Sequence, residues 1–239
     1  MTCHISQKLR RRTMRRKPAT KKLAPKTALA VRRIVKAQMN KVIETKRNDY
    51  FNEPFPISTY YHNTWYIHDF NCLYCDQGVR DEEDVTSNNR IGDSIYAKAL
   101  TLKLLITKYF DRPNTMIRIL VLKVKSGLTL NNPTIHNQVG NVIVNPINME
   151  LPNLISVVYD QTFTSNSNVS NPMSGTRDTK FFWKKTFPIN KRIKYPDSST
   201  DPSHYTYRVY TALYDTQGAL TTDNIGRFSY FRSLYFQDA

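Results

Sequence analysis

The pattern of apolar and polar side chains changes near residue 47 and divides the chain into two parts. In the second part, apolar residues recur at every other position, which is the period of a β-strand with one buried face. The clearest case lies in residues 94–110, where Leu100, Leu102, Leu104 and Ile106 alternate with mostly polar neighbours. No long stretch with a period of three to four separates such runs, which argues against parallel βαβ units.

The pattern predicts about eight strands in this second part. Three further alternating sets are Ile117, Ile119 and Val121, then Ile155, Val157, Tyr159 and Phe163, then Tyr205, Tyr207, Val209 and Leu213. Four other strand-like runs are Ile57–Phe70, Lys180–Phe187, Arg192–Tyr195 and Ile225–Phe236. The connections are rich in Asn, Asp, Ser and Pro, which supply turn geometry. We therefore predict an all-β fold, an eight-stranded antiparallel jelly-roll sandwich over residues 48–239.

Residues 1–47 follow a different pattern. The first 26 residues contain almost no apolar side chains, so this segment cannot bury enough surface to fold alone. After it, Val31, Val35, Met39 and Val42 recur at steps of three or four, which marks one face of a helix. We expect a basic N-terminal arm that ranges from disordered to helical, with a short amphipathic helix before the sandwich.

Charge separates the same two parts of the chain. Residues 1–47 contain 16 Lys or Arg and one acid, Glu44, which gives a net charge of +15. Residues 48–239 contain 19 basic and 18 acidic residues, which gives +1. A basic run of this density repels itself, and it is stabilised beside a polyanion because each cation that meets a phosphate releases condensed counterions. The arm is therefore predicted to bind nucleic acid.

The predicted nucleic-acid contacts are the cations of the arm: Lys8, Arg10, Arg11, Arg12, Arg15, Arg16, Lys17, Lys21, Lys22, Lys26, Arg32, Arg33 and Lys36. The densest group lies in residues 10–17, and nuclear import receptors read short basic runs of this kind. Charge without a positioned recognition element binds the phosphate backbone and not the bases. A solubilising tail is the competing interpretation, which the near neutrality of the remaining chain disfavours.

A second basic stretch, residues 180–195, mixes aromatic residues with cations. Aromatic stacking combined with cations holds single-stranded nucleic acid without sequence preference. The secondary contacts predicted here are Lys184, Lys185, Lys191 and Arg192. The favoured alternative is that the aromatic residues of this stretch fill the core or a subunit interface. These aromatic residues are Phe181, Phe182, Trp183 and Tyr195.

Cys72 and Cys75 form a CxxC pair, with His62 and His68 upstream. Structural zinc sites usually combine two close pairs of ligands, whereas these two histidines stand six residues apart. We expect two reduced, partly buried thiols and no metal site. The acidic turn Asp81–Asp84 is expected to be a solvated loop, and a divalent cation at a subunit junction is the alternative.

Catalysis and membrane insertion are not indicated by the sequence. The seven glycines stand too far apart for a phosphate-cradling loop, and the five histidines form no HExxH motif. We therefore expect neither an enzyme nor a cofactor. The segment 142–159 lacks Lys and Arg, but Asn, Glu and Pro interrupt it, which argues against a membrane span.

Five segments stand in a distinctive order behind the basic arm. They are "RIGDSIYAKALTLKLLI" (Arg90–Ile106), "NTMIRILVLKVK" (Asn114–Lys125), "LISVVYDQTF" (Leu154–Phe163), "KFFWKKTFPINKRIKY" (Lys180–Tyr195) and "RFSYFRSLYFQD" (Arg227–Asp238). Over essentially the whole chain, this series resembles the coat proteins of small circular Rep-encoding single-stranded DNA viruses, the circovirus-like group and its relatives. Each segment is a loose match, and the order carries the resemblance.

The resemblance implies a single jelly roll, similar to that of satellite tobacco necrosis virus, in a shell of about 60 copies around the genome. It implies single-stranded DNA as the packaged nucleic acid, although a flexible basic arm would bind RNA equally well. The implied partners are copies of the chain, the genome and a nuclear import receptor, and the implied locations are the virion and the host nucleus. The alternative is a non-viral nucleic-acid-binding β-domain protein with a basic tail. Such a protein would normally carry its positive patch on the folded part, which is nearly neutral here.

Overall fold

The structure is a computed structural model, and it describes residues 25–42, 44–52, 59–78, 89–109, 111–112, 114–128, 140–146, 154–166, 179–218 and 220–238. The chain divides into two compact units, Met1–Glu44 and Thr45–Ala239. The second unit begins three residues before the expected boundary, so Lys46 and Arg47 belong to it. The first 44 residues then hold 14 Lys or Arg and one acid, a net charge of +13 of the total +16.

Helix α1 (Pro25–Val42) is the described part of the first unit. It begins with a proline, whose fixed φ and missing N–H suit the first helical position. Leu29, Val31, Ile34 and Val35 are all exposed on this unit. The short helix predicted in the arm is therefore present, and it ends at Val42. No helix in the described ranges is both long and apolar enough to cross a membrane.

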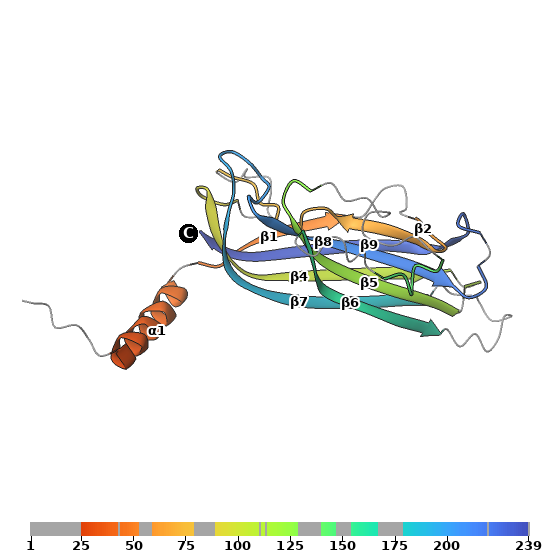
Figure 1. Ribbon diagram of the computed structural model, residues 1–239, viewed down its shortest axis with the longest axis horizontal. Helices are drawn as coiled ribbons and strands as arrows, with labels where there is room; N and C mark the ends of the chain where they lie inside the picture. The colour runs from red at the N-terminus through yellow and green to blue at the C-terminus, as the bar shows by residue number, and fades with distance from the viewer. Residues whose placement is uncertain are drawn as a thin grey trace, which may run out of the picture. The chain divides into compact units, whose positions relative to one another are not determined.

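Among the described residues of the second unit, nine strands form two antiparallel sheets packed as a sandwich (Figure 1). Sheet A has the order β1-β9-β4-β7, and β2 also pairs with β9. Its strands are β1 (Lys46–Asn52), β2 (Thr59–Tyr61), β4 (Ser94–Lys108), β7 (Thr179–Lys194) and β9 (Asn224–Asp238). Sheet B has the order β3-β8-β5-β6. Its strands are β3 (Thr64–Asp69), β5 (Asn114–Lys125), β6 (Ile155–Asn166) and β8 (Tyr205–Asp215).

The connections between strands cross repeatedly from one sheet to the other. The chain changes sheets between β2 and β3, β3 and β4, β4 and β5, β6 and β7, β7 and β8, and β8 and β9. β1 and β2 together fill one strand position, because they pair with successive parts of β9, residues 230–236 and 224–227. Nine strands therefore occupy eight positions in the order of a jelly roll, and the predicted fold class is confirmed.

Strand boundaries differ from the prediction in three places. The run Ile57–Phe70 is two strands in different sheets, separated at Asn63, whose φ is 54°. The runs 180–187 and 192–195 are one continuous strand, β7, with an irregularity where Asn190 adopts a φ of 48°. The sequence pattern missed β1, because its residues, KRNDYFN, do not alternate between apolar and polar.

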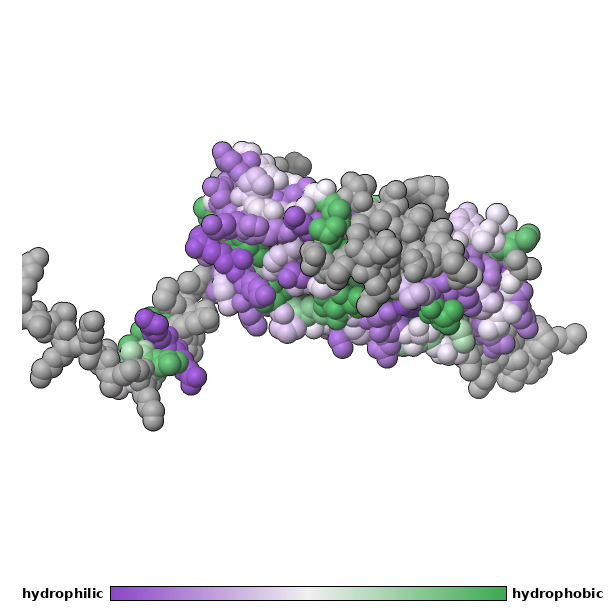
Figure 2. All heavy atoms as spheres, in the orientation of Figure 1, coloured by the Kyte–Doolittle hydropathy of each residue, from purple (hydrophilic) through white to green (hydrophobic). Residues whose placement is uncertain are grey.

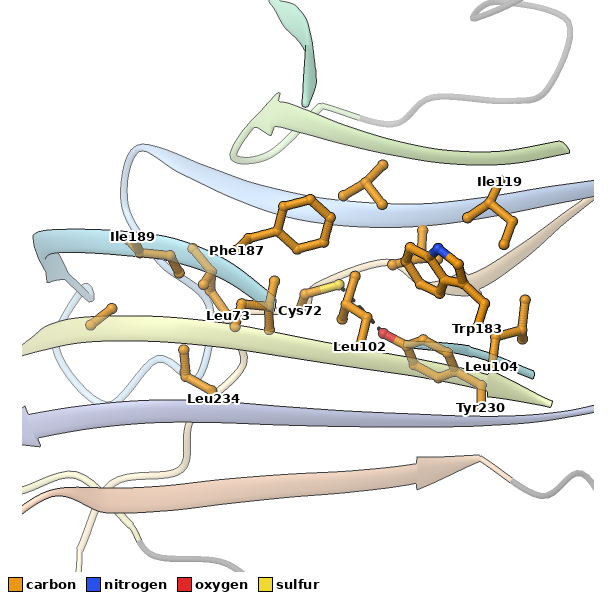
Figure 3. Close-up of a cluster of buried hydrophobic side chains, with 14 of the residues drawn as sticks. Cys72, Leu73, Leu102, Leu104, Ile119, Trp183, Phe187, Ile189, Tyr230 and Leu234 are labelled. Carbon is orange, nitrogen blue, oxygen red and sulfur yellow. Dashed lines mark hydrogen bonds between the residues drawn. The ribbon is translucent and has the colours of Figure 1, made fainter. Parts of the chain in front are cut away.

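The main hydrophobic core lies between the two sheets. Leu102 and Leu104 of β4, Ile119 of β5 and Leu234 of β9 are fully buried in one cluster, and Trp183 of β7 packs with them (Figure 3). The inward sets predicted for β4, β5 and β8 are confirmed, since their aliphatic members are all fully buried. Each Leu or Ile side chain buried in this way stabilises the fold by about 1.5–3 kcal/mol.

β6 departs from its predicted pattern. The sequence places Ile155, Val157, Tyr159 and Phe163 on one buried face, but the register with β5 shifts between Val157 and Tyr159. Tyr159 and Phe163 pack on the main core, Ile155 lies in a second cluster, and Val157 is 49% exposed. The prediction for Val157 is wrong, because one extra residue in the strand reverses the alternation beyond it.

The second apolar cluster uses the side chains of sheet B that alternate with those of the main core. It includes Trp65 and Leu120, and residues 140–146 contribute to it through Val142 and Ile143. Arg118 holds this segment in place by donating hydrogen bonds to three of its carbonyl oxygens, those of Val142, Ile143 and Asn145. The same guanidinium forms two hydrogen bonds with Asp160 of β6. Sheet B is therefore buried on both faces along β5 and β8.

Candidate nucleic-acid interface

Most of the predicted arm contacts precede the described part of the chain. Those outside the described residues are Lys8, Arg10, Arg11, Arg12, Arg15, Arg16, Lys17, Lys21 and Lys22. Lys26 and Lys36 belong to α1, but their side chains also lie outside the description. Arg32 and Arg33 are described, and both are exposed on α1. The helix thus presents adjacent guanidinium groups to solvent together with exposed apolar side chains (Figure 2).

The four cations predicted on β7 do not form one group. Lys184 lies on the outer face of sheet A, where its cross-strand neighbour is Lys103 of β4. Lys185 lies at the edge of the sandwich, with its Nζ 5.3 Å from the ring centroid of Tyr159 on β6. β7 is the edge strand of sheet A, so both side chains remain exposed. Alternation along one strand has separated two residues that are adjacent in sequence.

Lys191 and Arg192 lie near the opposite end of β7. The Arg192 guanidinium donates through Nε and Nη2 to the Ser94 hydroxyl, at 3.1 and 2.8 Å. Burial lowers the pKa of Lys123 of sheet B, and the positive charge of Lys191 lowers that pKa further. The sequence alone did not connect these two lysines.

The aromatic residues of the same stretch follow the alternative interpretation. Trp183 and Tyr195 are 6% and 3% exposed and belong to the main core, and Phe181 packs against that core. Phe182 is the exception, at 62% exposed on the outer face beside Lys184. On that face the Lys103 ammonium lies 4.6 Å from the ring centroid of Phe231. Three of the four aromatic residues thus stabilise the sandwich and offer no ring to a nucleic acid.

A second gathering of cations lies at the end of the sandwich where β1 begins. Lys46 opens β1 and forms an ion pair with Asp238 near the end of β9, with Nζ and Oδ2 2.6 Å apart. β5 ends at this same end with Lys125, and β8 begins there. Hydrophilic side chains gather here on the face shown in Figure 2. We call this the arm end, because residue 44 and the arm precede β1.

The arm end contains a cleft of about 330 Å³. Its polar lining residues are Lys123, Lys125, Ser156, His204 and Tyr205. Its remaining lining residues are Val124, Leu154 and Ile155. Sequence reasoning missed this cleft, because it joins the end of β5, the start of β6 and the start of β8, and no local motif marks such a junction.

The CxxC pair lies inside the sandwich and is not arranged as a metal site. Cys72 and Cys75 are free thiols and fully buried, and Cys72 Sγ lies 3.7 Å from the Tyr230 hydroxyl (Figure 3). Burial raises the pKa of Cys75 to about 12 and that of Cys72 well above its usual range. Thiols of this kind are poor nucleophiles and poor ligands. Within the described residues, no three His, Cys, Asp or Glu side chains are placed to hold a metal ion.

The two histidines upstream of the CxxC pair have structural partners. His62 Nδ1 accepts a hydrogen bond from the backbone N–H of Asp215, at 3.2 Å. His68 Nε2 lies 2.7 Å from the Tyr60 hydroxyl and 2.6 Å from the Thr211 hydroxyl. Burial lowers the pKa of His68 to about 3, so its ring stays neutral at physiological pH. The acidic turn Asp81–Asp84, the remaining candidate site, lies outside the described residues.

Comparison with known proteins does not place the chain in a family. It matches no protein-family model, and no curated protein is similar to it at a significant level. The division between the basic arm and the nearly neutral sandwich is therefore the main indication of function.

Proposed function

We propose that the protein is the coat protein of a small virus. In this proposal the sandwich assembles with copies of itself into a closed icosahedral shell of about 60 subunits. The arm lies on the nucleic-acid side of the shell and packages a single-stranded genome, which the sequence resemblance suggests is DNA. Residues 10–17 additionally serve as a nuclear import signal, so that the protein acts in the host nucleus and in the virion. No catalytic step and no cofactor are part of the proposal.

The partition of charge is the observation that carries this proposal. The first 44 residues have a net charge of +13, whereas the 195 residues of the second unit account for the remaining +3. About 60 arms would bring roughly 800 positive charges into one shell, which neutralises a large share of a genome of a few thousand nucleotides. Binding of this kind follows the phosphate backbone and depends on salt.

The surface of the sandwich is compatible with contacts between copies. Large apolar side chains are exposed on it at Phe51, Phe70, Ile91, Val144 and Phe182, each more than half exposed. Jelly rolls are a common architecture of viral shells, but the fold alone does not establish the function. The exposed aromatic and aliphatic groups favour protein partners, since such residues form the buried centres of interfaces.

Size-exclusion chromatography and electron microscopy of the full chain test the proposal. We expect uniform closed particles that contain nucleic acid protected from nuclease. A protein that stays monomeric at every salt concentration while binding nucleic acid would instead support the non-viral β-domain protein with a basic tail. Disassembly at high salt should release the nucleic acid, because the arm contacts weaken as salt rises.

A further inference from the structure

The cleft at the arm end has the composition of a site for an anion. Among the residues that the structure describes, its lining contains two lysines and a histidine and no acidic side chain. Lys123 is only partly exposed, and its ammonium lies 3.9 Å from the ring centroid of Tyr205. That contact fixes the position of the cation without neutralising it, because an aromatic ring carries no net charge.

The charges around Lys123 are unfavourable in the structure as it stands. Burial lowers the pKa of Lys123, and the like charge of Lys191 on β7 lowers it further. An anion in the cleft would offset both effects by supplying the missing opposite charge. Lys125, the next inward-facing position of β5, is exposed at the mouth of the cleft and can contact the same anion.

The cleft is also large enough for more than a single ion. Its volume, about 330 Å³, lies within the range of small-ligand sites, about 300–1,000 Å³. The ring of Tyr205 adds an apolar surface beside the lysines, and Ser156 and His204 add groups that can donate hydrogen bonds. A phosphate joined to a sugar and a base matches this combination of cationic and apolar surfaces.

The position of the cleft connects it with the arm. The backbone of Lys125 donates to the carbonyl of Leu154, and that of Ser126 donates to the carbonyl of His204, which ties the three chain segments of the cleft together. The chain enters the sandwich at this same end, at Lys46. A nucleic acid held by the arm is thereby tethered to the end of the sandwich that carries the cleft, which raises its local concentration there.

We propose that this cleft binds a phosphate group of the nucleic acid, with Lys123 and Lys125 as its cationic ligands and Ser156 and His204 as hydrogen-bond donors. The inference rests on the proposed packaging function and extends it, because it gives the sandwich a defined contact with the nucleic-acid backbone in addition to the contacts of the arm. Lys191, which the sequence predicted as a secondary nucleic-acid contact on β7, adds a further positive charge that acts on Lys123.

Lysine footprinting of the full chain tests the site directly. The protein is treated with an amine-reactive reagent, alone and with a short oligothymidylate, and modification is read at each lysine by mass spectrometry. We expect the oligonucleotide to protect Lys123 and Lys125 more than Lys103 and Lys180. The second pair is the matched control, because both residues lie on the outer face of sheet A and neither lines the cleft. Equal protection of the two pairs would overturn the proposal.

The same footprinting is repeated with inorganic phosphate and with chloride, at matched ionic strength. These two samples identify the source of the phosphate group. Protection by the oligonucleotide, with or without protection by phosphate, supports a backbone contact. Protection by inorganic phosphate alone would show a free-anion site and overturn the nucleic-acid assignment. The measurement needs no particles, so a protein that fails to assemble but shows protected Lys123 and Lys125 would refute the shell and leave the site standing.

Paired substitutions give an independent test. In Lys123→Gln/Lys125→Gln, the slope of log K against log salt for single-stranded DNA should fall in magnitude by about 0.7, because the one phosphate contact that the two lysines share is lost. Lys103→Gln/Lys180→Gln removes the same charge and should change the slope much less. Identical slopes in the two variants would contradict the site. Thermal unfolding of both variants should match the parent protein, which excludes misfolding as the cause.

Discussion

The arm and the sandwich differ in how they distribute charged and apolar side chains. The first 44 residues concentrate positive charge, and the described side chains of α1 are mostly exposed. The sandwich pairs much of its charge internally, as in Arg118 with Asp160 and Arg232 with Asp69, and buries its apolar side chains between sheets. Affinity for nucleic acid should therefore depend on the arm, and stability should depend on the sandwich.

Deleting residues 1–44 should have the largest effect on binding and almost none on folding. Both hydrophobic clusters begin at Tyr60 or later, so the free energy of unfolding should change by less than about 0.5 kcal/mol. Affinity for single-stranded DNA at low salt should fall at least about 10³-fold, since a large set of phosphate contacts is lost. Fluorescence anisotropy over a range of salt and chemical unfolding measure the two quantities. A truncated protein that unfolds would show that the arm is part of the core.

A cavity in the core should have the reverse effect. Leu102 is fully buried between the sheets, and Leu102→Ala should lower the free energy of unfolding by about 2–5 kcal/mol. Phe182→Ala is the matched control on the outer face, where the side chain is 62% exposed, and it should change stability by less than about 1 kcal/mol. Neither substitution should change the salt dependence of nucleic-acid binding while the protein remains folded. A large loss at Phe182 would mean that the outer face is buried in the molecule as it exists in solution.

Low pH should reduce the folding stability of the sandwich but should not affect the arm. Burial lowers the pKa of His68 from its usual 6.5 to about 3. Below pH 6.5 the His68 ring therefore binds a proton in the unfolded chain but stays neutral in the folded chain. Stability is then lost as the pH falls from about 6.5 toward 3, by about 2 kcal/mol at pH 5 from this group alone. Chemical unfolding at pH 7 and pH 5 measures the loss. In His68→Gln the difference between the two pH values should shrink by about that amount; an unchanged difference would assign the acid sensitivity to other groups.

Removing a single cation of the arm should have the smallest effect on nucleic-acid binding. Arg33 is exposed on α1, and Arg33→Gln should reduce the magnitude of the salt slope for single-stranded DNA by about 0.7. Arg47 is also exposed but lies in β1, paired with Asp49 at 2.8 Å, so Arg47→Gln should change the slope less. If the two substitutions change the slope equally, charge on the sandwich contributes to binding as much as charge on the arm, which would contradict the proposed role of the arm.

The sequence predicted the part of the fold that local pattern controls. Alternation located the buried face of β4, because Leu100, Leu102, Leu104 and Ile106 all point to one side of a regular strand. The same rule failed at Val157, where one extra residue reverses which face each side chain occupies. It also failed at β1, which pairs with β9, because these are the first and last strands of the domain in sequence. Bulges and distant pairings depend on the partner strand, so one strand read alone does not reveal them.

For the candidate site, too, the sequence predicted the local features and missed those that depend on contacts between distant segments. The charge of the arm is a local property of the sequence, and Arg32 and Arg33 are exposed on α1. The cations of β7 looked like one group in sequence, but the strand sends Lys184 and Lys185 to different surroundings. The cleft at the arm end was not foreseen, because Lys123 and His204 meet only when β5 and β8 pair.

We propose that the sandwich builds a shell and that the arm fills this shell with nucleic acid. Sedimentation of the full chain and of residues 45–239, each after nuclease treatment, measures the nucleic acid retained per subunit. We expect the full chain to sediment as a closed particle with protected nucleic acid, and residues 45–239 to retain almost none in any form. A full-length protein that sediments as a monomer, or a truncated one that protects as much nucleic acid as the full chain, would contradict it.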